Sequence, residues 1–187
     1  MIYICIKFKN KMKKLIAIIL PLFVFIFACK NVEQFRKPIE SLSADWEKAT
    51  TSFTDAGTLL ASVQGSIAGL KDSLVVDPKM KLDANKLKLV DSLKSSFMGN
   101  FAGLTEMANK LTSVSANWQD GTTKLAALKE GLTSGKLDAT TLTQIESLKS
   151  MLSETNSTTQ AVTEAANASK TSAMSIYEAF KAAIAKK

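Results

Sequence analysis

The sequence IESLSADWEKATTSFTDAGTLLASVQGSIAGLKDSL, residues 39–74, decides the fold of this chain. Apolar or small residues recur in it at alternating steps of three and four, a spacing that places them on one stripe of a helix. The stripe is Ile39, Leu42, Trp46, Ala49, Phe53, Ala56, Leu60, Val63, Ile67, Leu70 and Leu74. Because no strand or loop would keep this period, the segment is predicted to be one long helix that buries its stripe against other helices.

Two later segments continue the same spacing. In the second, only Asn100 and Gly121 interrupt the stripe, so one unbroken helix is favoured over a break near Gly121. Its stripe is Val90, Leu93, Phe97, Asn100, Leu104, Met107, Leu111, Val114, Trp118, Gly121, Leu125, Leu128 and Leu132. The third stripe is smaller and more polar in its middle: Ile145, Leu148, Leu152, Thr155, Thr159, Val162, Ala166, Ser169, Ala173, Ile176, Phe180 and Ala183.

Turn and capping residues separate the three segments. Asp77-Pro78 breaks the first pattern, and Asp83 can cap the helix that follows. Gly135 suits the position just past the second helix, and Asp138 repeats the capping arrangement of Asp83. The helices are therefore predicted at about residues 38–74, 84–133 and 138–186.

Short connections make neighbouring helices antiparallel, so the predicted fold is all-α: an elongated antiparallel three-helix bundle with heptad packing like that of a coiled coil. Reversal at Asp77 would bring Leu74 level with Ala84. Reversal near Gly135 would bring Asn100 level with about Thr171, and a polar layer is expected between Asn100 and Ser169 or a neighbouring residue. Five glycines within heptads are interpreted as points of close helix approach: Gly57, Gly65, Gly69, Gly99 and Gly103.

An internal repeat relates residues 81–97 to residues 136–152 without gaps. Lys-Leu-Asp-Ala opens both copies, and VDSLKS at 90–95 matches IESLKS at 145–150. A duplicated binding unit is one interpretation. Reuse of one cap and heptad to start each helix is the other, and it is favoured because repeated units usually serve packing.

The chain also carries an export signal. Met12-Lys13-Lys14 is a positive segment, residues 15–28 are an apolar run, and Ala28 is a small residue directly before Cys29. The sequence Ile26-Phe27-Ala28-Cys29 resembles the lipobox of bacterial lipoproteins. The resemblance implies cleavage between Ala28 and Cys29, lipidation of the Cys29 thiol, and a membrane anchor. Lys30 in place of an aspartate implies the outer membrane.

Two other interpretations of this segment remain. An ordinary signal peptide could be cut after Ala28 and leave Cys29 free, or the run could be an uncleaved membrane anchor, although 14 residues with Pro21 are fewer than the roughly 20 that a spanning helix needs. The simplest account of the first eleven residues is that the true start is Met12. The predicted domains are a signal peptide at 1–28, a lipidated tether at 29–37 and a helical bundle at 38–187, whose first helix opens at Pro38.

Composition argues against several functions. Five of the 24 basic residues but none of the 17 acidic ones precede Cys29, which leaves a nearly neutral mature chain with 19 basic residues. A nucleic-acid partner, which needs a clustered basic face, is therefore not expected. The chain has no histidine, and its mature part has Cys29 alone, so no metal site, cofactor or disulfide is expected.

No catalytic residues are predicted. Asp91 and Glu146 recur in the repeat but fit solvated helix surface, and Trp46 and Trp118 fall on core positions. The expected function is a lipoprotein of the cell envelope with a structural or protein-interaction role. The alternative is a helical module that binds a lipid or another apolar ligand. A third reading links the C-terminal Lys187 covalently to peptidoglycan.

Overall fold

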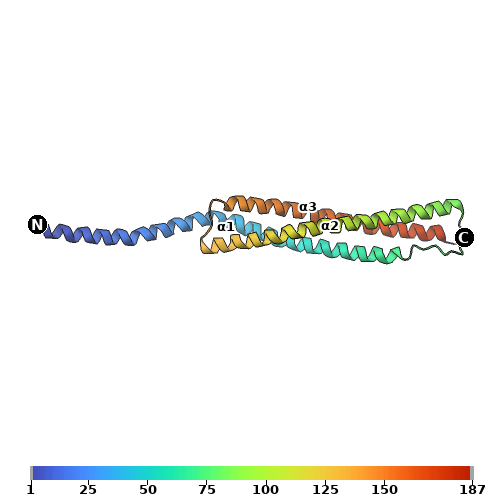
Figure 1. Cartoon of the computed structure of the whole chain (residues 1–187), viewed down its shortest axis with the longest axis horizontal. Coiled ribbons are helices and arrows are strands. Elements are labelled where there is room, and N and C mark those ends of the chain that lie inside the picture. The colour runs from blue at the N-terminus through green and yellow to red at the C-terminus, as the bar shows by residue number, and fades with distance from the viewer. Residues whose placement is uncertain (1, 186–187) are drawn as a thin grey trace. The chain divides into compact units, whose positions relative to one another are not determined.

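The computed structural model describes residues 2–185, and side chains from residue 32 onward. It contains three helices, α1 (Ile2–Lys71), α2 (Ala84–Ser134) and α3 (Thr141–Ile184), and no strand within that range (Figure 1). The predicted all-α three-helix bundle is confirmed. α2 runs unbroken past Gly121, so the favoured interpretation of the second segment is also correct.

Contacts divide the chain into two units, each built from parts of all three helices. The first unit is Met1–Asp45 with Gly121–Ser150, and the second unit is Trp46–Asp120 with Met151–Lys187. Every residue of the three predicted stripes is buried or half-buried. The heptad pattern therefore identified the core of both units, because each stripe faces the other two helices of its unit.

Side-chain contacts fix the order of the helices in the second unit. The Gln64 amide donates to the Leu104 carbonyl at 3.3 Å, so residue numbers on α1 rise as those on α2 fall. The same holds between α2 and α3, where Asn100 meets Ser172 and Lys94 lies over the Phe180 ring. Both neighbouring pairs of helices are therefore antiparallel in this unit.

The predicted register between α1 and α2 is wrong by about six residues at the Trp46–Trp118 stack and by about ten at Gln64. Leu74 level with Ala84 would place Gln64 level with Lys94, whereas Gln64 contacts Leu104. The reason is the connection: α1 ends at Lys71, and the chain then runs through turns at Leu70–Ser73 and at Asp77–Met80 before α2 begins. A connection of this length does not require the two helix ends to lie level.

In the first unit, the predicted tether is wrong for residues 32–37. Val32 and Phe35 are buried on α1, at 7% and 2% exposure, and the helix continues through Pro38 rather than opening there. The two residues extend the stripe of Ile39 by the same steps of three and four. Although the segment is mostly polar, this spacing is sufficient to place its two large apolar side chains in the core.

The helix ends follow the predicted capping chemistry with one difference. The Asp83 carboxylate accepts hydrogen bonds from the backbone N–H groups of Asn85 and Lys86, as a helix cap does. The Asp138 carboxylate instead accepts both the N–H and the hydroxyl of Thr140. α3 therefore starts three residues later than predicted, at Thr141.

Gly135 ends α2 as predicted. Its φ is 71°, in the left-handed region, and the Lys136 N–H donates to the Gly131 carbonyl at 2.9 Å. This bond between the second residue past the helix and the last turn defines a Schellman cap.

The interpretation of the glycines within heptads is largely wrong. A Cβ atom at Gly57 would lie 3.5 Å from the Leu111 side chain, an ordinary contact. At four others nothing lies within 4 Å of such an atom: Gly65, Gly69, Gly99 and Gly103. These four glycines are not required by packing between the described residues.

Replacing a glycine by alanine should therefore change the free energy of unfolding in opposite directions at two positions, Gly65 and Gly135. Gly65→Ala is expected to raise the free energy of unfolding by about 0.5–1 kcal/mol, because alanine favours a helix and meets no neighbour. Gly135→Ala should lower it by more, about 1–2 kcal/mol, because a side chain is strained at positive φ. Urea denaturation followed by circular dichroism measures both. A loss of stability in Gly65→Ala would show that this glycine contacts something absent from the bundle.

Candidate functional site

The predicted lipidation site, Cys29, and the cleavage position after Ala28 lie outside the residues whose side chains the structure describes. Both stay predictions. Within the described range, no helix combines the length and the hydropathy needed to cross a membrane.

The two carboxylates of the repeat are surface groups. Asp91 belongs to the second unit and Glu146 to the first, and both side chains are exposed. Among the side chains from residue 32 onward, there is no group of three or more histidine, cysteine, aspartate or glutamate residues that could hold a metal ion.

A stacked pair of tryptophans forms a distinctive layer in the core of the second unit. The rings of Trp46 on α1 and Trp118 on α2 lie 3.7 Å apart between centroids, with 7° between their planes. The Trp118 indole N–H donates to the Thr50 hydroxyl at 3.2 Å, and this hydroxyl donates to the Trp46 carbonyl at 2.8 Å. Trp46 and Trp118 are 3% and 6% exposed. The heptad placed each ring in the core, but their contact depends on the register between α1 and α2.

The predicted polar layer is present, with Ser172 as the partner rather than Ser169. The Asn100 amide donates to the Ser172 hydroxyl at 3.1 Å and to the Ser96 carbonyl at 3.3 Å. Asn100 is half-buried, so part of its hydrogen-bonding capacity still reaches water. The expected level of Asn100 with Thr171 was thus correct to within one residue.

Substituting Asn100 tests what this layer does. Asn100→Leu is expected to raise the thermal midpoint or leave it unchanged, because an apolar side chain suits the stripe, while the pairing of α2 with α3 becomes less specific. Ser172→Ala, which keeps Asn100, should cost about 1 kcal/mol of stability. Thermal unfolding, with disulfide trapping between cysteines placed on α2 and α3, reads both effects. Strong destabilisation by Asn100→Leu without any change of pairing would contradict this role.

The middle of α3 has small polar residues where the other helices have large apolar ones. Thr155 and Thr159 are buried, at 1% and 6% exposure. The Thr159 hydroxyl oxygen has no hydrogen-bond partner among the described residues. A buried hydroxyl without a partner costs about 1–3 kcal/mol, so this part of α3 is held less firmly than a leucine-rich helix would be.

A shallow groove of about 310 Å³ lies between α1 and α2 in the second unit. Small and polar residues form much of its wall. It is lined by Phe53, Gly57, Leu60, Ala61, Gln64, Ala108, Leu111, Thr112 and Ser115. Its mixed lining differs from the mostly apolar enclosure that holds small ligands tightly.

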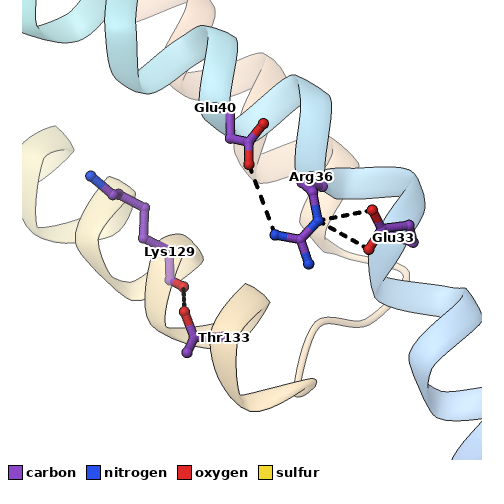
Figure 2. Close-up of polar contacts among 5 residues, drawn as sticks. All are labelled: Glu33, Arg36, Glu40, Lys129 and Thr133. Carbon is purple, nitrogen blue, oxygen red and sulfur yellow. Dashed lines mark hydrogen bonds and ion pairs between the residues drawn. The ribbon is translucent and has the colours of Figure 1, made fainter.

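The start of the described part of α1 has a surface ion cluster in the first unit. Figure 2 shows Arg36 between Glu33, at 2.8 Å, and Glu40, at 3.8 Å. The hydrogen bond and the charge of Glu33 raise the pKa of Arg36. On α2, the Lys129 ammonium donates to the Ser43 hydroxyl of α1 at 3.1 Å. The Arg36 ion pairs lie within α1 and are exposed, so they stabilise that helix only weakly, and only the Lys129–Ser43 bond joins α1 to α2.

Two other exposed groups have shifted pKa values. Hydrogen bonds from Thr140 lower the pKa of Asp138, and the hydrogen bond to Glu178 raises the pKa of Lys181. Because the folded Asp138 pKa is the lower one, its contribution to stability is present above the unfolded pKa and is lost as the pH falls through the folded value. Neither group has the burial that a catalytic acid or base usually has.

Comparison with protein families, with curated proteins and with solved structures found no match to this chain.

Proposed function

We propose that this protein is a lipid-anchored lipoprotein of the bacterial cell envelope, in the outer membrane, with a structural or protein-interaction role. The observation that carries the proposal is the combination of a lipobox-like segment ending at Cys29 with helices whose apolar stripes are used in packing. The outward faces then remain for contacts with other molecules. Large exposed side chains such as Leu142 and Met174, at 54% and 55% exposure, lie on these faces.

The proposed role is binding rather than catalysis. Asp91 and Glu146 are exposed on the helix surfaces, whereas the burial and charge partners that tune a catalytic acid or base are usually found in a cleft. A protein that presents helical faces needs no such arrangement. The exposed charges instead keep the outer surface soluble.

Cross-linking in membranes tests the interaction role. The full-length acylated protein, with a photoreactive amino acid at Leu142 or Met174, is irradiated in cells and recovered from membranes. A discrete cross-linked species is expected from at least one position. The same amino acid at buried Leu148 is the matched control and should give none. Equal products from all three positions, or from none, would count against an interaction role.

The second candidate is a module for a lipid or another apolar ligand. The polar middle of α3, with the Thr159 hydroxyl lacking a described partner, favours it because this part of the core could open at low cost. Extraction of the purified full-length protein with organic solvent, followed by lipid analysis, separates the candidates. A stoichiometric lipid beyond the chains on Cys29 would support the ligand-binding module.

A further inference from the structure

One exposed face at the start of α2 combines apolar and charged side chains in a self-complementary order. Leu87, Asp91, Lys94 and Met98 follow at steps of four, three and four residues, which places them on one side of the helix. Leu87 is 48% exposed and Met98 43%. Along the helix the order is apolar, acidic, basic, apolar. We call these four residues the α2 face.

The α2 face is open because α1 stops short of it. Gln64 lies level with Leu104, so the last residue of α1, Lys71, lies level with about Phe97. The helix from Ala84 to Ser96 thus extends past the end of α1, where Leu74, Val76 and Leu82 of the connection pack against the core in place of a helical turn. A side chain such as Leu87, on the flank of the core stripe, is left in contact with water.

The two charges of the α2 face differ in exposure: Asp91 is exposed, and Lys94 is half-buried. Among the described residues, no ion pair involves Asp91. The Lys94 ammonium lies 5.8 Å from the centroid of the Phe180 ring, which keeps it beside the helix rather than extended into solvent. An exposed acidic group and a half-buried basic group therefore lie three residues apart on the same side of α2.

We propose that two copies of this chain pair through the α2 face, antiparallel and about a two-fold axis between Ser92 and Leu93. An antiparallel pair about this axis brings Asp91 of each copy beside Lys94 of the other. It also brings Leu87 of each copy beside Met98 of the other. Both apolar pairs and both charge pairs form at once, because a two-fold interface repeats every contact. Because the acidic and basic groups of the α2 face are complementary to those of an antiparallel second α2 face, the partner is a second copy of this chain.

The repeat supplies an internal comparison. On α3, Leu142, Glu146 and Lys149 follow at the same spacing, but Ser153 stands where the α2 face has Met98. The charge pairs could form there, but leucine would meet serine in place of methionine. The α2 face is therefore the one that pairs, and the α3 segment is a control for charge alone.

A contact limited to about three helical turns predicts a weak dimer, because it is smaller than the interfaces of stable complexes. The test uses the full-length protein in a density-matched detergent, with sedimentation equilibrium over a hundredfold range of concentration. Wild type should pass from monomer to dimer within this range.

A zero-length carbodiimide cross-linker then tests the geometry, because it joins a carboxylate directly to an amine in contact with it. Mixing ¹⁴N- and ¹⁵N-labelled protein separates links between chains from links within one helix. The expected product is a mixed-isotope peptide that joins Asp91 of one copy to Lys94 of the other.

Leu87→Ser should raise the dissociation constant of the dimer about tenfold or more. In a two-fold dimer this one substitution removes both contacts between Leu87 and Met98. The matched control is Leu89→Ser, since Leu89 is 49% exposed on the same helix but points away from the face. Asp91→Lys should also weaken the dimer, and Asp91→Lys with Lys94→Asp should restore it. Glu146→Lys on α3 should change nothing.

A monomer at all concentrations would overturn the proposal. So would equal dimerisation of Leu87→Ser and wild type, or links between Asp91 and Lys94 confined to single-isotope peptides. Circular dichroism of each variant shows that the helices remain folded.

Discussion

Trp118→Ala is expected to lower the free energy of unfolding by about 3–5 kcal/mol, the usual range for removing a buried tryptophan. The ring of Trp118 is almost fully buried and stacks on Trp46 at 3.7 Å. Its removal leaves a cavity beside Trp46 and takes the indole N–H away from the Thr50 hydroxyl. Urea denaturation monitored by circular dichroism and by the remaining tryptophan fluorescence measures the change.

Two further variants assign this loss to its causes. Trp118→Phe keeps an aromatic ring but has no N–H, so it should cost clearly less than Trp118→Ala. In a double-mutant cycle, replacing Trp46 and Trp118 by alanine together should cost less than the sum of the single losses. The difference is expected to be about 0.5–1.5 kcal/mol for a stacked aromatic pair. Additive single losses would show that the two rings do not interact in solution.

Cys29→Ser is expected to abolish acylation and to release the protein from the membrane fraction. Cys29 follows the predicted signal, and serine has no thiol for the diacylglyceryl group. Several acyl chains are needed for stable anchoring, since one chain alone binds a membrane only marginally. Metabolic labelling with a fatty acid and fractionation of cells give the two readouts.

The chain contains its own control for this variant. Cys5 precedes the predicted signal and is not translated at all if the chain starts at Met12, so in either case Cys5→Ser should leave both labelling and fractionation unchanged. Intact-mass analysis of the mature wild-type protein should show a start at Cys29 with the added acyl mass. An unmodified Cys29, or a mature start at another residue, would exclude the lipoprotein interpretation.

Local chemistry made much of the fold predictable. Asp83 caps α2 and Gly135 ends it because each interaction lies within a few residues of sequence. Asp138 shows the limit of this reasoning. The same Lys-Leu-Asp-Ala motif starts both copies of the repeat. In the second copy, however, the Thr140 hydroxyl donates a hydrogen bond to the Asp138 carboxylate, and α3 begins only at Thr141. Here a neighbouring hydroxyl, rather than the motif, decided the start of the helix.

The candidate sites were predictable only in part. The sequence identified Asn100 as a polar break in the core and placed its partner within three residues of Ser169. It placed Trp46 and Trp118 in the core but gave no sign that their rings stack. The α2 face was equally hidden, because its exposure depends on where α1 ends relative to α2.

By itself, the sequence determined the number of helices, the side of each that is buried and the chemistry of the helix ends. These properties follow from a period of three and four residues and from contacts between near neighbours. Only the tertiary structure decided that Val32 and Phe35 belong to the core, that Trp46 meets Trp118, and that Leu104 rather than Lys94 lies level with Gln64. The physical reason is that a heptad repeat looks nearly the same after a shift of seven residues, so the register is selected by how particular large and small side chains fit together.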